Sequence, residues 1–138
     1  ITVRPNPNAK GFDLTTLCYP GFPTDMQAQM CALACVIPDT STITETIFPQ
    51  RFMHCAETKR MGANIDLQGA TARIRGGAPM KGAPVMASDL RASAALVLTG
   101  LVAEGKTEIN RLYHIDRGYE HLDDKLAALG ANLERVRG

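Results

Sequence analysis

The sequence lacks several features that would have pointed to particular classes of protein. It contains no run of about 18 consecutive apolar residues, which excludes a membrane-spanning helix. It carries no excess of charge, since the formal net charge is +1, whereas a domain dominated by a nucleic-acid-binding surface usually shows a marked basic excess. The apolar content of 45% is ordinary for a soluble globular protein. The 138 residues therefore predict one compact domain, long enough to bury roughly two-thirds of the unfolded chain's surface.

The sequence also lacks Cys-x-x-Cys and His-x-x-x-His pairs. Its four cysteines are Cys18, Cys31, Cys35 and Cys55. Cys31 and Cys35 would lie one turn apart on a helix, but a metal site built on them would need two more ligands, and the three histidines are scattered along the chain. We interpret the cysteines as small buried hydrophobes in a reducing compartment, predict neither a metal nor a cofactor, and favour the cytoplasm.

An internal repeat organises what is present. Each copy begins at a polar pair that opens an apolar helical run, continues into a β-like stretch, and ends with a second helix. The paired segments are Thr24-Asp25 and Ser88-Asp89, Ser41–Phe48 and Thr107–Tyr113, and Met61–Ile65 and Leu129–Leu133. Helices that alternate with strands predict sheets packed on helices, an α/β or α+β fold. A duplicated scaffold with no chemistry is an alternative at this point.

The repeat predicts two units, residues 1–81 and 82–138, joined near Arg75–Gly77 and Lys81-Gly82. The first unit starts inside an element, because Ile1–Arg4 has the composition of a strand and no initiator methionine precedes it. We take this as a hint that the chain is a piece of a longer one.

Local patterns predict how the elements begin and end. In the first copy Thr24 and Gln27 form a capping box, and in the second Ser88 is the cap. The expected buried helix faces are Met26, Met30, Leu33 and Ile37, and Leu90, Ala94, Val97 and Leu101. The expected helix-closing glycines are Gly62 and Gly130, and the expected strands that follow are Ala63–Leu67, paired with Ala70–Ile74 across Gln68-Gly69, and Asn132–Val136.

Asp25 is the first candidate for chemistry. It lies at the start of a helix, where a negative charge is favourable for structural reasons alone. The preceding loop, Gly21–Thr24, is stiff, however, and would hold the carboxylate in a fixed position at a loop–helix junction. That arrangement also suits a general base that must reach a substrate hydroxyl. The sequence is compatible with both roles.

Three arginines are the other candidates. Arg91 follows Asp89 in the first turn of a helix, where a cation is unfavourable unless it pairs with a carboxylate or meets an anionic ligand. Arg51 and Arg117 lie at matching junctions of the two copies, each between a strand and a helix, and Arg117 is expected in an exposed, mobile loop. Guanidinium groups bind phosphate and carboxylate bidentately, so a converging set would suit a small, multiply charged substrate.

Five segments resemble motifs of the enolpyruvyl transferases, and specifically the C-terminal part of those that use UDP-N-acetylglucosamine. The segments are Pro20–Gln29, Thr44–Phe48, Arg51–His54, Gly82–Ala95 and Tyr113–Glu120. The resemblance implies an inside-out α/β barrel with helices inside and sheets outside, of which the repeat would be two of three units in one domain. It also implies transfer of enolpyruvyl from phosphoenolpyruvate to the sugar's 3'-hydroxyl with release of phosphate, in the first committed step of peptidoglycan synthesis.

The resemblance assigns roles to individual residues. Asp25 matches the base at the 3'-hydroxyl, and Ile47 matches a position whose backbone touches the UDP-sugar. Arg91 and Arg117 match arginines that bind phosphoenolpyruvate and hold the closed state. The residues that match positions lining the site are Arg51 and Asp89, for which a structural ion pair is the competing role.

The chain departs from the family in one respect. The family's reactive cysteine, the target of fosfomycin, lies in the other domain, and none of the four cysteines here matches it. We therefore expect one wall of a cleft, inactive alone and dependent on the missing N-terminal portion of the enzyme. The alternatives are the related shikimate-3-phosphate transferase and a non-catalytic, duplicated anion-binding module.

Overall fold

The computed structural model describes residues 2–136, which form a mixed α/β structure. Its elements in chain order are β1 (Asp13–Thr15), η1 (Thr24–Met26), α1 (Gln27–Val36), β2 (Thr40–Thr44), α2 (Met53–Arg60), β3 (Asn64–Gln68), β4 (Thr71–Arg75), β5 (Pro84–Met86), α3 (Leu90–Val102), β6 (Glu108–Asn110), α4 (Tyr113–Asp116) and α5 (Leu122–Ala128). Within the described residues, no helix has the length and apolar character needed to cross a membrane.

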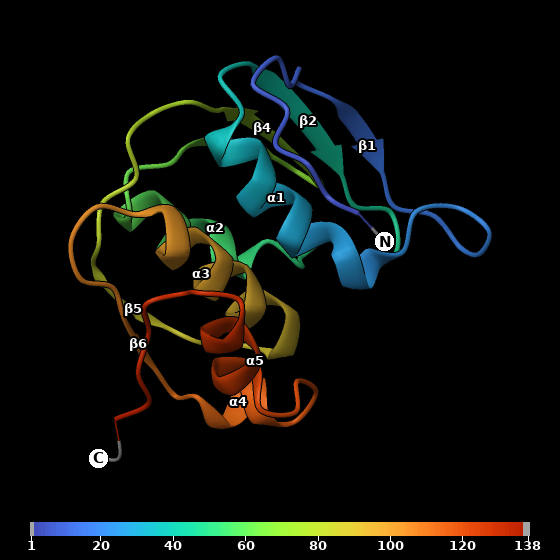
Figure 1. Ribbon diagram of the computed structural model, residues 1–138. Helices are drawn as coiled ribbons and strands as arrows, with labels where there is room; N and C mark the ends of the chain where they lie inside the picture. The colour runs from blue at the N-terminus through green and yellow to red at the C-terminus, as the bar shows by residue number, and fades with distance from the viewer. Residues whose placement is uncertain (1, 137–138) are drawn as a thin grey trace.

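The repeat is visible as two strand–helix–strand modules. In the first, α1 connects the parallel strands β1 and β2, and in the second, α3 connects the parallel strands β5 and β6. The first module belongs to a four-stranded sheet of order β1-β2-β4-β3, whereas the second forms a two-stranded sheet. Helices α1 and α3 pack against each other, and α2 packs on α3 (Figure 1).

The expected layering, with helices inside and sheet outside, is confirmed. Ile43 and Ile74 point from β2 and β4 into the core and are fully buried, while their neighbours Thr42 and Arg73 lie on the opposite face. That opposite face is polar, which explains why it can remain uncovered. No barrel closes within residues 2–136, where the larger sheet covers one side of the helices.

The turn predictions from glycine are confirmed. Gly62 and Gly130 both have positive φ, +99° and +95°, at the ends of α2 and α5. Strands β3 and β4 form the expected hairpin across Gln68 and Gly69. After β4, Gly76 approaches the end of α1 so closely that a Cβ there would lie 2.1 Å from the Ala34 carbonyl oxygen.

The predicted buried stripes of the two long helices are wrong in part, although Ile37 and Ala94 are buried as expected. Met26 of η1 and Leu33 of α1 are each 46% exposed, and the buried residues of α1 are Gln27, Ala28, Cys31, Ala32, Ala34 and Cys35. In α3, Leu101 is exposed, and the buried residues are Ala92, Ser93, Ala94, Ala95, Leu96 and Thr99. The central helices touch one another closely, so their contact faces need small side chains more than large ones.

Both predicted helix caps are also wrong. Thr24 donates its hydroxyl to Glu45 instead of capping a helix, and the Gln27 amide donates to the Arg51 carbonyl. At the start of α3 the cap is Asp89, whose carboxylate accepts from the amides of Arg91 and Ala92. These amides are among the groups that a helix start leaves unpaired, so a carboxylate there is favourable.

Five segments differ from their predicted structure, and two of them, β1 and β5, are strands that no pattern predicted. Residues 2–4 and 132–136 are not in strands, and Ile1 lies outside the described residues. Within the described part of the chain, residues 132–136 pair with no strand, and an unpaired segment forms no ladder of main-chain hydrogen bonds. The expected loop after β6 contains the short helix α4.

The cysteine predictions are partly confirmed. Cys31, Cys35 and Cys55 are buried, as expected of small hydrophobes, but Cys18 is exposed. The histidines are not all scattered in space, because His54 lies beside Cys31 and Cys55.

Candidate active site

Asp25 lies in η1, at the exposed edge of the helix layer, and its side chain is 52% exposed. Its two carboxylate oxygens accept hydrogen bonds from two arginines, at 2.8 Å from Arg51 Nη1 and at 3.1 Å from Arg91 Nη2. Arg51 belongs to the first repeat and Arg91 to the second. One carboxylate therefore joins the two repeats through two guanidinium groups.

Each arginine rests on an aromatic ring. The guanidinium of Arg51 lies over Phe48, 5.4 Å from the ring centroid, and that of Arg91 lies over Tyr119 at 5.5 Å. Stacking of this kind stabilises a cation while leaving its N–H groups free for anions. Both arginine side chains are about three-quarters buried, with 25% and 27% exposure, so they are held in place at the surface.

A buried carboxylate supports the cluster from behind. Glu45 is fully buried, and its Oε1 accepts from the Thr16 hydroxyl at 2.6 Å and from the amides of Ile47 and Phe48. Its Oε2 accepts from the Thr24 hydroxyl at 2.8 Å. Thr24 in turn accepts a hydrogen bond from Arg51, so Glu45 fixes both the loop after β2 and the helix start that carries Asp25.

The electrostatics follow from these contacts. The hydrogen bond from Arg51 lowers the pKa of Asp25, and the charge of Arg91 lowers it further. The hydrogen bond to Tyr119 raises the pKa of Arg91, and Asp25 adds to this effect. Burial tends to raise the pKa of Glu45, but its hydrogen bonds outweigh burial and the pKa is lowered. Both carboxylates are therefore ionised at neutral pH.

The structure brings some of the predicted site residues together and separates others. Asp25, Arg51 and Arg91 form one cluster. The Asp89 carboxylate forms no ion pair with the Arg91 guanidinium. It instead caps α3 by accepting hydrogen bonds from the main-chain amides of Arg91 and Ala92. Ile47 lies in the loop that carries the cluster, and since its amide already donates to Glu45, its carbonyl is the backbone group left for a ligand.

Arg117 lies apart from the cluster in the structure. It is exposed at the end of α4 and, within the described residues, has no hydrogen bond or ion pair to Asp25, Arg51 or Arg91. It lines the same surface hollow as Tyr119, which contacts Arg91. The expected exposure of Arg117 is confirmed.

Sequence reasoning missed two residues of the cluster. The Tyr119 hydroxyl accepts from Arg91 at 3.1 Å and from Gln29 Nε2 at 3.0 Å, and so bridges α1 and α3. Glu45 lies within the segment Thr44–Phe48, to which the resemblance assigns no role at this position. Tyr119 lies two residues from Arg117, and Glu45 lies within the predicted β-like stretch Ser41–Phe48, so both are close to recognised positions. The contacts themselves depend on tertiary packing.

Known proteins resemble the chain in sequence and in structure. The family EPSP synthase (3-phosphoshikimate 1-carboxyvinyltransferase) matches residues 1–126. A UDP-N-acetylglucosamine 1-carboxyvinyltransferase of Halorhodospira halophila is 58% identical over 99% of this chain and 32% of its own length. The enzyme of that name from Methylacidiphilum infernorum is 62% identical over 92% of the chain and 30% of its own length.

Two solved structures resemble the fold. The enolpyruvyl transferase NikO of Streptomyces tendae has a TM-score of 0.82 at 28% identity, with 89% of this chain and 28% of that one covered. An EPSP synthase of Acinetobacter baumannii has a TM-score of 0.67 at 20% identity, with 82% of this chain and 27% of that one covered, and shows the fold alone. The chain spans about a third of the length of the curated relatives it matches. It belongs to the EPSP synthase (3-phosphoshikimate 1-carboxyvinyltransferase) family.

Proposed function

We propose that the protein containing this chain transfers enolpyruvyl from phosphoenolpyruvate to the 3'-hydroxyl of UDP-N-acetylglucosamine and releases phosphate. The observation that carries this proposal is the carboxylate of Asp25 held between two arginines from separate repeats. A carboxylate suits a substrate hydroxyl, and the arginines suit the phosphate and carboxylate of phosphoenolpyruvate. The names of the relatives at 58% and 62% identity support the choice of acceptor.

The reaction proceeds by addition and then elimination. The acceptor oxygen bonds to C2 of phosphoenolpyruvate while C3 takes up a proton, which gives a tetrahedral intermediate. Loss of a proton from C3 and departure of phosphate then restore the double bond. Asp25 takes the proton from the attacking hydroxyl, and the group that serves C3 lies outside this chain.

The arginines have a second effect on Asp25. In the ligand-free arrangement they lower its pKa, which makes it a weak base. We expect Arg91 and Arg51 to turn toward the anionic groups of phosphoenolpyruvate when it binds. Asp25 then loses its cationic partners and becomes more basic as the substrate arrives.

The remaining residues have supporting roles in this proposal. Arg117 binds phosphoenolpyruvate once the site closes, and the carbonyl of Ile47 contacts the UDP-sugar. Asp89 acts through α3, by fixing the turn that carries Arg91. Residues 1–81 and 82–138 are the two repeat units and form one wall of the cleft, so the chain alone is inactive and needs the remaining N-terminal portion.

Such an enzyme acts in the cytoplasm, in peptidoglycan synthesis, and hence contributes to cell shape and division. It is a target of fosfomycin through a cysteine outside this chain.

The experiment uses the complete protein and measures phosphate release from phosphoenolpyruvate with each of two acceptors. We expect turnover with UDP-N-acetylglucosamine and none with shikimate-3-phosphate. Turnover with shikimate-3-phosphate alone would establish the related transferase instead. Failure to turn over either acceptor, with binding of phosphoenolpyruvate retained, would establish a non-catalytic anion-binding module.

A further inference from the structure

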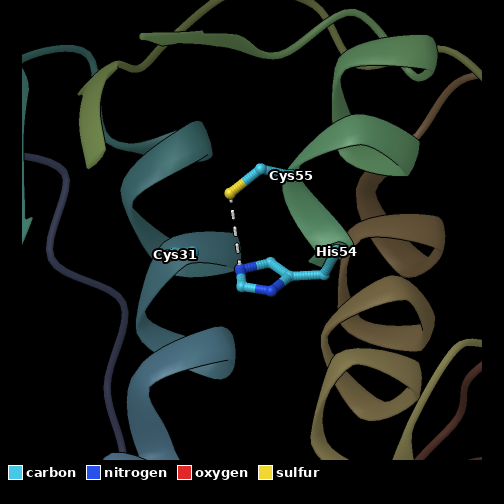
Figure 2. Close-up of side chains that lie close together, drawn as sticks. All are labelled: Cys31, His54 and Cys55. Atoms are coloured by element: carbon cyan, nitrogen blue, oxygen red, sulfur yellow. Dashed lines mark hydrogen bonds between the residues drawn. The ribbon is translucent and has the colours of Figure 1, made fainter. Parts of the chain in front are cut away.

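A second cluster of polar side chains lies between α1 and α2. Cys31 of α1 and His54 and Cys55 of α2 each offer one ligand atom, and the three atoms lie within 4.8 Å of one another. Figure 2 shows the Cys55 sulfur and the His54 ring directed into the space beside α1. None of the three belongs to the set assigned to the substrates.

The burial of this cluster is unusual for its chemistry. Cys31, His54 and Cys55 are 1%, 2% and 0% exposed. Within residues 2–136, the only polar partner of the His54 ring is the Cys55 sulfur, with Nε2 and Sγ 3.7 Å apart. Sulfur is a weak hydrogen-bond partner, and a buried imidazole is normally better satisfied than this.

We propose that Cys31, His54 and Cys55 form a binding site for a soft divalent metal ion, with zinc as the best match. Thiolate and imidazole are the ligands that zinc takes in proteins, at about 2.3 Å and 2.0–2.1 Å. Around a tetrahedral ion these lengths place a sulfur and a nitrogen about 3.6 Å apart. The observed separation of 3.7 Å between His54 Nε2 and Cys55 Sγ already matches this edge.

The remaining contacts need only a small closure. Two sulfurs on one tetrahedral zinc are about 3.8 Å apart, and the three donors here lie within 4.8 Å. Cys31 and Cys55 belong to one buried cluster, and we expect rotation of their side chains to close the remaining gap. Two thiolates also neutralise the ion's double positive charge, which suits a site with no access to water.

A fourth donor is available nearby. Cys35 is buried and lies one helical turn after Cys31 on the same face of α1. It completes a tetrahedral site if its side chain turns toward Cys55. Binding releases the two thiol protons of Cys31 and Cys55 and that of Cys35 where it joins, because thiolates are the ligating form.

The site would fasten α1 to α2. Both helices carry parts of the candidate active site at their starts, since η1 precedes α1 and Arg51 precedes α2. An ion at this position would therefore stabilise the scaffold under the substrate cluster without touching the substrates. The prediction is a structural metal, whose loss lowers stability more than it lowers turnover.

The test uses the complete protein, freed of metal by a chelator, and three variants of it. Cys55→Val and Cys31→Ala remove one ligand each while keeping the core apolar, and Cys18→Ser changes an exposed cysteine as the matched control. Zinc is titrated and bound metal is counted, and cobalt serves as a spectroscopic probe of thiolate ligation. We expect the parent and Cys18→Ser to bind the same number of ions and each ligand variant to bind one fewer.

The expected loss of metal affinity in the ligand variants has a lower limit. Loss of a partner that only orients a ligand weakens metal affinity by about 10–100-fold, so loss of a ligand should weaken it by more than about 100-fold. In the parent, cobalt should give a thiolate-to-metal charge-transfer band that Cys55→Val lacks. Zinc should also raise the melting temperature of the parent and leave that of Cys55→Val unchanged.

Three results would overturn the proposal. One is equal metal content in the parent and in both ligand variants. Another is the absence of any thiolate–cobalt band in the parent, which needs no variant and therefore stands even if the variants fail to fold. The third is a Cys31–Cys55 disulfide in the purified protein under reducing conditions, with no metal bound.

Discussion

Glu45 provides the sharpest prediction about how the substrate cluster is held. The Glu45→Ala variant removes a buried carboxylate that accepts four hydrogen bonds, two from hydroxyls and two from the amides of Ile47 and Phe48. The hydroxyls can rotate toward other acceptors, but the amides have fixed directions. The main cost is therefore that of two amides left without an acceptor.

Each such amide costs about 1–3 kcal/mol, and since both are only partly buried we expect about 2–4 kcal/mol in total. The Glu45→Gln variant should cost about 1–2 kcal/mol, because its amide oxygen can keep the donors at Oε1. Its nitrogen would then face Thr24, whose hydroxyl must turn around. Glu45→Gln differs from the parent in charge and hydrogen bonding far more than in shape.

The effect depends on pH in a defined direction. The pKa of Glu45 is lowered in the folded protein, from an unfolded value of about 4.3. Its charge therefore stabilises the fold fully above about pH 4.3, and this stabilisation is lost as the pH falls through the folded pKa. The difference between the parent and Glu45→Gln should be constant near neutral pH and shrink in acid.

Hydrogen exchange of the complete protein measures this locally. A cost of 2–4 kcal/mol predicts that the amides of Ile47 and Phe48 exchange roughly 30- to 1000-fold faster in Glu45→Ala. The control is Glu57→Ala, which removes a carboxylate bonded to the Met86 amide and should leave this loop unchanged. If these two amides exchange in Glu45→Ala at a rate within threefold of the parent, Glu45 does not hold the loop after β2.

Three further predictions concern single side chains. Gly76→Ala should destabilise the protein by about 1–3 kcal/mol in denaturant unfolding, because its Cβ would lie 2.1 Å from the Ala34 oxygen, and unchanged stability would contradict the close approach. Tyr119→Phe should raise KM for phosphoenolpyruvate by roughly 3- to 10-fold in steady-state kinetics, because Arg91 loses one fixed partner; an unchanged KM would count against this bridge. Arg117→Lys should lower kcat/KM by at least about tenfold, since a point charge cannot replace a planar fork, and full activity would remove Arg117 from the site.

The repeat and its turns were predictable from sequence because their signals are local. Gly62 and Gly130 each close a helix in the same conformation. The short strands β1 and β5, which complete the two modules, carry no such signal and were not predicted. The faces of the helices were not predictable in the same way. Periodicity assigned Met26 and Leu33 to the core, but α1 lies between a sheet and α3, where small residues such as Ala34 fit.

In the candidate active site, too, local sequence signals were predictive and tertiary contacts were not. Asp25 and Arg91 stood out in sequence because each is a charge at the start of a helix, and the structure brings them together across the two repeats. The partner of Arg91 was not predictable, since Asp89 is nearer in sequence but is used as the cap. The proximity of His54 to Cys31 also depends on how α2 packs against α1, which no local pattern reveals.

The most direct test of the central claim is the turnover of Asp25→Asn in the complete protein. This variant removes the proposed base but keeps the shape, and its two half-exposed ion pairs are worth only about 0–1 kcal/mol each in stability. Asp66→Asn, on the outer face of the sheet, is the matched control. We predict that Asp25→Asn loses about 10²–10⁴-fold in kcat with its fold and phosphoenolpyruvate binding retained, while Asp66→Asn is unaffected. Full activity in Asp25→Asn would contradict the account.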